Sequence, residues 1–191
     1  MSKIKKFRIT KYKKEVKPII QMKGMSKKYG QKNIIQNLDL NILPSSINGL
    51  LGPNGSGKTT LFNLLLGIVK ADAGQIFGCL DGKKSSRLDY LPIHQRCKEY
   101  KIGFIPQNES LFRGLSCIDN LIGIGEIVLK DKRQIKEKVE NLLIEFSLSE
   151  CRHTLAGDLS GGQKKKLSIA RALIGDCRIL FMDEIFSAID P

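Results

Sequence analysis

The chain has 191 residues, a length that suits one domain with a hydrophobic core of its own. Hydrophobic residues make up 41% and charged residues 27%, as in ordinary globular proteins. No run approaches the roughly 18 apolar residues of a membrane-spanning helix, and the N-terminus lacks the apolar segment of a secretory signal. The five cysteines are scattered and form no C-x-x-C pair, which favours reduced thiols over a disulfide or zinc framework.

The net charge of +13 is concentrated near the N-terminus. Residues 1–28 hold eleven Lys and Arg against one acid, Glu15, and so carry +10 of the total. We expect residues 1–17 to be a basic flexible extension, solvated and able to approach anionic lipid. We expect no nucleic-acid partner.

In the first half of the chain, short strands broken by turns are expected over residues 19–43, where apolar residues alternate up to Ile42. A strand over 46–51 runs into a glycine-rich loop, and a buried helix is expected over 58–69. Residues 70–100 are polar and rich in turns, and a short strand is expected over 102–105.

Helical patterning covers most of the second half. It extends over residues 116–151, and Ser160 is suited to cap a further helix that ends near Gly175. Residues 178–182 are an apolar strand. The alternation of strands and helices predicts an α/β protein with a mostly parallel sheet, interrupted by a separate helical lobe over about residues 108–158.

The glycine-rich loop matches the P-loop pattern G-x-x-x-x-G-K-[ST]. Glycines let backbone N–H groups converge on phosphate oxygens, and the following helix adds the positive end of its dipole. Lys58 is placed to reach the β- and γ-phosphates, and the Thr59 hydroxyl is suited to ligate Mg²⁺. The predicted nucleotide-binding residues of this loop are Gly52, Pro53, Asn54, Gly55, Ser56, Gly57, Lys58, Thr59 and Thr60.

Two carboxylates follow the apolar strand over residues 178–182. In open parallel sheets, ligands bind at the carboxyl ends of the strands. We expect Asp183 to hold Mg²⁺ through water and Glu184 to act as the general base that polarises the attacking water.

A second anion site is predicted where Leu159, Ser160, Gly161, Gly162 and Gln163 open a helix. One ATP does not need two phosphate-binding sites that lie far apart in sequence. The second site is most simply explained if it binds the nucleotide of another copy of this chain. This implies a head-to-tail homodimer closed by two ATP molecules.

The order of these motifs resembles that of the nucleotide-binding subunits of ABC transporters, over about residues 20–191. The resemblance implies a RecA-like P-loop NTPase fold with an antiparallel β lobe and an inserted helical subdomain, within an ATP-binding domain over 18–191. It implies that Gln107 contacts Mg²⁺, that Tyr29 stacks on adenine, and that Asp190 lies in a loop at the dimer interface. It also implies transmembrane permease subunits as partners.

A narrower resemblance is to the ATPases of bacterial lipopolysaccharide export. It rests on residues 91–96, 102–116 and 119–121. It implies a cytoplasmic homodimer, peripheral on the cytoplasmic face of the inner membrane, that powers lipopolysaccharide extraction through two permease subunits. Related amino-acid-uptake ATPases share parts of the same run.

The chain departs from the family pattern in several places. It ends at Pro191, before the family's last core strands and its switch histidine, and we expect His94 and His153 to be surface residues instead. Ile185 stands where the family usually has proline, and Asn48 lies inside the strand before the P-loop. An alternative hypothesis is therefore a truncated or degenerate fragment that binds ATP without hydrolysing it. A soluble P-loop kinase or GTPase is disfavoured by the segment from Leu159 to Gln163 and by the lack of an N-K-x-D guanine motif.

Overall fold

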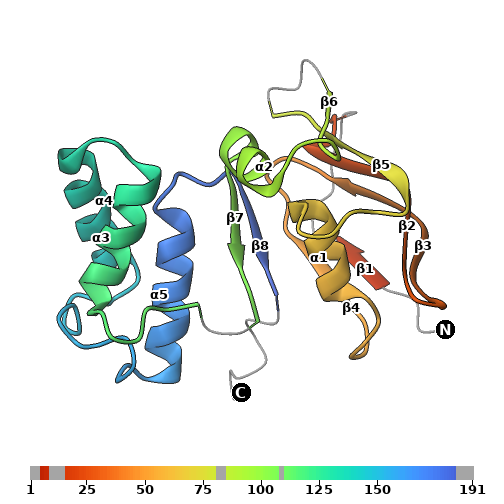
Figure 1. The fold of residues 1–191 in the computed structure, drawn as a ribbon. Helices are drawn as coiled ribbons and strands as arrows, with labels where there is room; N and C mark the ends of the chain where they lie inside the picture. The colour runs from red at the N-terminus through yellow and green to blue at the C-terminus, as the bar shows by residue number, and fades with distance from the viewer. Residues whose placement is uncertain (1–4, 9–15, 81–84, 108–109, 184–191) are drawn as a thin grey trace. The chain divides into compact units, whose positions relative to one another are not determined.

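The computed structural model describes residues 5–8, 16–80, 85–107 and 110–183 (Figure 1). The chain divides into two compact units, residues 1–100 and 101–191. Each unit is described by itself below. Within the described residues, no helix is long and apolar enough to cross a membrane.

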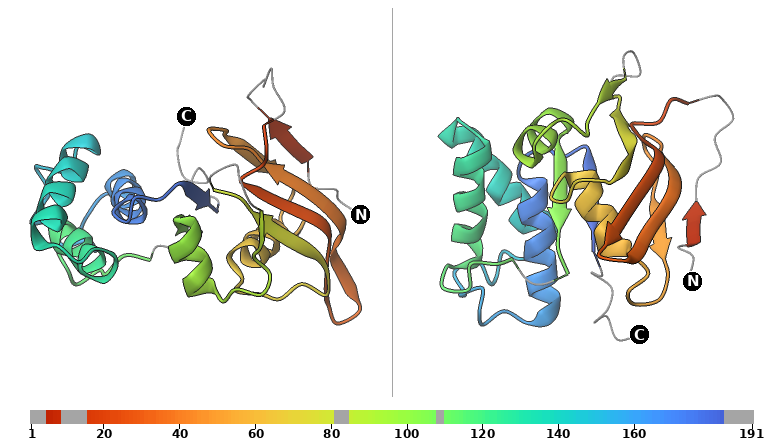
Figure 2. Two further views of the ribbon diagram at one scale, coloured as in Figure 1. Left: turned by 90° about the horizontal axis from the view of Figure 1, so that it is seen from above. Right: turned by 45° about the vertical axis from the view of Figure 1, so that its right-hand side comes forward.

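The first unit is built on an antiparallel sheet with the strand order β3-β2-β5-β6. Its first two strands form a long hairpin with a turn at Gly30 and Gln31 (Figure 2). Strands joined by a turn were expected over residues 19–43, but the two strands are longer than the short ones expected. The strands are β2 (Ile20–Tyr29), β3 (Lys32–Ile42), β5 (Ala73–Gly78) and β6 (Ser86–Arg87).

A bulge lets β2 keep its apolar side chains on one face. Ile20, Met22 and Met25 are all fully buried, although strict alternation would turn Met25 outward. The pairing of β2 with β3 shifts register between Met22 and Met25, and Gly24 in that interval has a φ of 60°. The extra residue restores Met25 to the core face, which explains why one strand spans the whole segment.

The strand that leads into the P-loop is β4 (Asn48–Leu51). It pairs antiparallel with β1 (Lys5–Arg8), in register from Lys5 opposite Leu51 to Arg8 opposite Asn48. These four residues lie inside the segment that the sequence predicts as a flexible extension. The pairing satisfies backbone polar groups along one edge of β4, which would otherwise need water.

Two helices complete the described part of the first unit: α1 (Lys58–Leu66), as expected, and α2 (Ile93–Tyr100), in a segment expected to hold only turns. The buried Arg96 of α2 donates hydrogen bonds to the carbonyl oxygens of Leu64 at 2.9 Å and Leu65 at 3.1 Å. Burial lowers the pKa of Arg96. Its guanidinium satisfies carbonyls at the C-terminal end of α1 and so ties the two helices together.

The second unit contains two parallel strands at the positions predicted from the sequence. β7 (Ile102–Ile105) pairs with β8 (Ile179–Met182), in register from Ile102 opposite Ile179 to Ile105 opposite Met182. The remaining elements are helical, as the patterning indicates. They are α3 (Cys117–Val128), α4 (Lys132–Glu145) and α5 (Gly161–Leu173).

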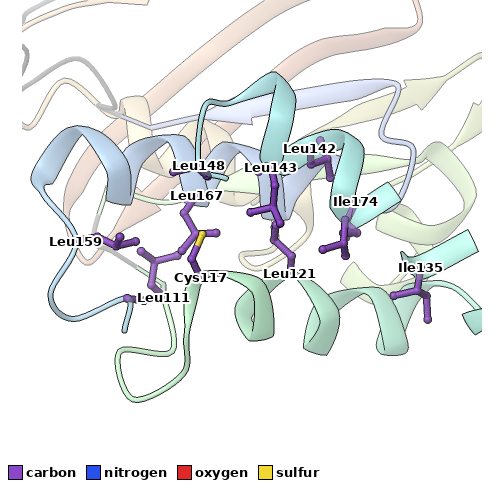
Figure 3. Close-up of a cluster of buried hydrophobic side chains, with 13 residues drawn as sticks. Leu111, Cys117, Leu121, Ile135, Leu142, Leu143, Leu148, Leu159, Leu167 and Ile174 are labelled. Atoms are coloured by element: carbon purple, nitrogen blue, oxygen red, sulfur yellow. The ribbon is translucent and has the colours of Figure 1, made fainter. Parts of the chain in front are cut away.

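An apolar cluster joins the three helices (Figure 3). Leu121 of α3, Leu143 of α4 and Leu167 of α5 are fully buried in it. Ile174 and Leu159 also belong to the cluster, so the packing of the helical lobe continues past residue 158 into α5. The start of α5 is thus held on a packed core, which positions the segment that precedes it.

Candidate nucleotide-binding site

The P-loop connects β4 to α1, and its backbone requires glycine. Gly55 and Gly57 have φ values of 76° and 99°, in the left-handed region that other residues avoid. A Cβ at Gly57 would lie only 2.9 Å from Cγ2 of Ile34. Gly57 is the N-cap of α1 and, having no side chain, makes no capping hydrogen bond. No N-cap side chain therefore competes with a ligand for the start of α1.

The groups around this helix start fit a phosphate ligand. The first turn of α1 contains no acidic residue, so its dipole is not already offset. The hydroxyl of Ser56 is buried and has no hydrogen-bond partner in the described structure. The Lys58 ammonium donates to the carbonyl oxygens of Gly52 at 2.8 Å and Pro53 at 3.1 Å, which holds its charge against the loop. An anion at this position would satisfy the Ser56 hydroxyl and the helix N–H groups together.

The rest of the predicted loop residues lie along the same turn. Thr59 is exposed at the start of α1, and Thr60 beside it is half-buried. The exposed loop residues are Pro53, Asn54 and Gly55. The amide of Asn48, in the strand before the loop, donates to the Ser46 hydroxyl at 2.8 Å.

Tyr29, the candidate adenine-stacking residue, is the last residue of β2. Its side chain is 49% exposed, as a stacking surface needs to be. The ammonium of Lys27 lies 5.6 Å from the centre of its ring, within the range of a cation–π contact. The ring therefore stands at the tip of the hairpin with a cation beside it.

In the second unit, the candidate magnesium ligands follow the carboxyl ends of the paired strands. Asp183 directly follows β8, is 3% exposed, and its backbone N–H donates to the carbonyl oxygen of Ile105 at 2.9 Å. Gln107 is exposed two residues after β7. Ile105 is paired with Met182 at the carboxyl ends of the two strands. Gln107 and Asp183 therefore both follow the same end of this strand pair.

The segment from Leu159 to Gln163 begins α5 with a capping box. The Ser160 hydroxyl accepts from the N–H of Gln163 at 3.3 Å, and the Gln163 side chain accepts from the N–H of Ser160 at 2.9 Å. Leu159 is buried, whereas Gly161 and Gly162 are exposed, and a Cβ on either glycine would meet no atom within 4 Å. The predicted Ser160 cap is confirmed, and the glycine backbone is open to an approaching molecule.

Two predicted functional residues, Glu184 and Asp190, lie outside the described residues, as does Ile185. His94 and His153 are exposed, as expected for surface residues. The five cysteines are free thiols, as expected.

Sequence reasoning missed the residues that shape the loop before α3. Asn120 is fully buried, and its side chain accepts from the N–H of Phe112 at 2.9 Å and donates to the carbonyl oxygens of Phe112 and Ser116, both at 3.0 Å. The guanidinium of Arg171 lies 4.8 Å from the centre of the Phe112 ring. Phe112 remains 47% exposed and Leu115 43%, so neither belongs to the core. Asn120 could have been found from the sequence, because it is a polar residue at a position of the helix that faces the core.

The glycine-rich loop between a strand and a helix defines the class of P-loop nucleotide-binding proteins. Residues 35–187 match the ABC transporter family. The chain belongs to this family.

Known relatives agree with this assignment. The chain is 38% identical to the lipopolysaccharide export system ATP-binding protein LptB of Haemophilus influenzae, over 91% of this chain and 70% of that protein. It is also 38% identical to a probable ABC transporter ATP-binding protein of Azorhizobium caulinodans, over 88% of this chain and 58% of that protein.

Among solved structures, cbiO1 of Clostridium perfringens, part of the ABC transporter complex cbiONQ, has a TM-score of 0.76 and 27% identity. The likeness covers 92% of this chain and 68% of that one. The predicted fold class, a P-loop NTPase with an antiparallel β lobe and a helical subdomain, is confirmed.

Proposed function

We propose that this chain is the ATP-binding and ATP-hydrolysing subunit of an ABC transporter that drives lipopolysaccharide export. The observation that carries the proposal is the P-loop itself: an uncapped helix start, an unpartnered buried Ser56 hydroxyl and Lys58 held beside the loop. The group that these three features fit is the phosphate chain of ATP. The ATP-binding domain is proposed to extend over residues 18–191, with its helical subdomain at about residues 108–158.

The proposed metal is Mg²⁺, bound by the Thr59 hydroxyl, Gln107 and, through water, Asp183. Bound Mg²⁺ would neutralise part of the phosphate charge. Oxygen donors of this kind suit Mg²⁺, which keeps several of its waters. Glu184 is the proposed general base, and Tyr29 is the proposed stacking surface for adenine.

The proposed assembly is a homodimer in which residues 159–163 of one copy contact the ATP of the other, with Asp190 near the interface. The exposed Gly161 and Gly162 support this role, because their backbone is accessible to a phosphate from another molecule. The partners are transmembrane permease subunits, which would place the chain on the cytoplasmic face of the inner membrane. No nucleic-acid partner is proposed.

Lipopolysaccharide is proposed as the transported molecule because of the sequence relatives. Proteins named as LptB from Haemophilus influenzae and from Escherichia coli K12 share 38% and 36% identity with this chain. The chain spans 70% and 68% of their lengths. The exposed Phe112 and Leu115, on the loop held by Asn120, are the proposed permease contact.

One set of measurements tests the nucleotide part of the proposal. Purified chain is titrated with Mg-ATP and then assayed for phosphate release, with Glu184→Gln as the comparison. Binding together with release that Glu184→Gln abolishes supports the proposal. Binding without any release favours the alternative, a fragment that holds ATP but does not hydrolyse it. No binding rejects both.

The permease contact is tested by co-purification with the permease pair encoded in the same genome. Phe112→Ala should lose the complex and keep ATP binding. Tyr90→Ala is the matched control, because Tyr90 is an aromatic residue that is 76% exposed elsewhere on the chain. Equal recovery of both variants with the permeases would reject the assignment of Phe112.

A further inference from the structure

Asp72 is a carboxylate outside the P-loop and outside the motifs discussed above, yet it is hydrogen-bonded to the segment that bears Tyr29. It lies just before β5, and its own N–H donates to the carbonyl oxygen of Ser26 at 3.0 Å. Its carboxylate accepts the N–H of Lys28 at 2.6 Å and the ammonium of Lys27 at 2.9 Å. Three hydrogen bonds thus join one residue to three consecutive residues of β2.

These bonds take over where the strand pairing stops. The described pairing of β2 with β5 ends at Ser26 opposite Ala73. Beyond that point, the N–H of Lys28 is bonded by the Asp72 side chain instead of a strand carbonyl. Asp72 therefore extends the support of β2 by two residues, up to the residue that precedes Tyr29.

A second connection reaches the ring through Lys27. The Lys27 side chain is only 14% exposed, and its ammonium lies 5.6 Å from the centre of the Tyr29 ring. The hydrogen bonds from Lys27 and from the N–H of Lys28 lower the pKa of Asp72, so its carboxylate is ionised at neutral pH. The negative charge of Asp72 holds the cation beside the ring.

We propose that Asp72 is a positioning residue for the adenine end of the nucleotide site, acting through Lys27 and the backbone of Lys28 on Tyr29. The inference rests on the proposed role of Tyr29 as the adenine-stacking residue. Tyr29 is half exposed at the tip of a hairpin, where the next residue, Gly30, has a φ of 57°. Tyr29 stays paired with Lys32 of β3, but on the β5 side Asp72 makes the bond to Lys28, and without that bond the plane of the ring would be less firmly fixed.

The proposal predicts an effect that depends on the base of the ligand. Affinities for Mg-ATP and for magnesium tripolyphosphate, which has no base, are measured in the parent chain and in Asp72→Asn. Base stacking on an aromatic residue contributes to affinity. Loss of part of it should weaken Mg-ATP binding about three- to tenfold. Binding of tripolyphosphate should stay within about twofold, because the P-loop is unchanged.

A matched control exists in the same sheet. The Asp39 carboxylate on β3 accepts the N–H of Gly24 of β2 at 2.7 Å, the same kind of bond at a different place along the strand. Asp39→Asn removes a similar carboxylate without touching the Lys27–Lys28–Tyr29 segment. It should leave the affinities for both ligands unchanged.

Tyr29→Ala separates failure of this inference from failure of the proposed function. If Tyr29→Ala leaves the preference for ATP over tripolyphosphate unchanged, Tyr29 is not the adenine surface, and the proposed role of Tyr29 and this inference both fall. If Tyr29→Ala removes the preference and Asp72→Asn does not, only the role of Asp72 is rejected. Equal weakening of both ligands by Asp72→Asn, or the same effect from Asp39→Asn, would mean that the carboxylate is merely structural.

Discussion

In the part of the chain that the structure describes, α1 and α5 both begin at glycines, and they differ in their N-caps. α1 begins after Gly57, whose φ of 99° places it in the left-handed region, and no side chain caps it. α5 begins after Ser160, in extended conformation, with a complete capping box that includes Gln163. Neither helix has an acid in its first turn.

This difference in capping affects how each helix start can bind a phosphate. At the start of α1, no N-cap side chain bonds to the helix N–H groups, so a phosphate does not have to displace one. At the start of α5, a phosphate has to share donors with the Ser160 hydroxyl or displace it. We therefore expect the single chain to bind ATP through the P-loop, and the α5 start to bind a phosphate only when a second copy presents it.

The strongest test of the comparison replaces one glycine at each helix start. Gly57→Ala should lower the free energy of unfolding by about 1–3 kcal/mol, because alanine is strained at positive φ. The Cβ would also press on Ile34, at 2.9 Å. Chemical denaturation measures the change.

Gly161→Ala is the matched control for that substitution. Its Cβ would meet no atom within 4 Å, and alanine favours helices more than glycine does. Unfolding free energy should stay the same or rise slightly. A loss as large as that of Gly57→Ala would mean that the two helix starts do not differ as described.

The second test concerns charge at the α1 start. Lys58→Ala should weaken Mg-ATP binding at least tenfold, about 1.4 kcal/mol, because it removes the cation beside the loop. Lys98→Ala, which removes an exposed lysine from α2, should have no effect. Titration calorimetry measures both, and equal affinity in Lys58→Ala and the parent would contradict the phosphate role of this helix start.

Both helix starts were predictable from sequence because each depends on neighbouring residues. The spacing of Gly52, Gly57 and Lys58 specifies a phosphate loop, and a serine three positions before a glutamine predicts the cap of α5. The apolar strands β7 and β8 were predictable for the same reason. A short sequence pattern is enough to predict a feature when residues close together in the chain form it.

The missed features depend on residues far apart in the chain. α2 was not predicted because a buried face position holds Arg96, whose carbonyl partners Leu64 and Leu65 lie about thirty residues earlier. The length of the hairpin strands was not predicted because it depends on a bulge at Gly24, which forms only in the pairing of β2 with β3. No local pattern indicated that Lys5–Arg8 would pair with β4.

The third test removes the side-chain cap, which α5 has and α1 lacks. Ser160→Ala should lower the stability of the second unit by about 1 kcal/mol, the usual value of an N-cap hydroxyl. Hydrogen exchange of the α5 amides follows this loss. A Ser160→Ala variant with unchanged exchange would show that the capping box contributes nothing.

The smallest expected effect has opposite signs for stability and for assembly. Gln163→Glu keeps the capping box and places a negative charge at the positive end of the α5 dipole, so stability should rise by about 0.3–1 kcal/mol. The same charge would repel the ATP that a second copy is proposed to present to this segment. ATP-dependent dimerisation, measured by analytical ultracentrifugation, should therefore weaken while ATP binding to the single chain stays unchanged. Gln163→Ala, which removes half of the capping box without adding charge, should lower stability instead. If Gln163→Glu strengthens ATP-dependent pairing, the α5 start does not receive the phosphate of a partner copy.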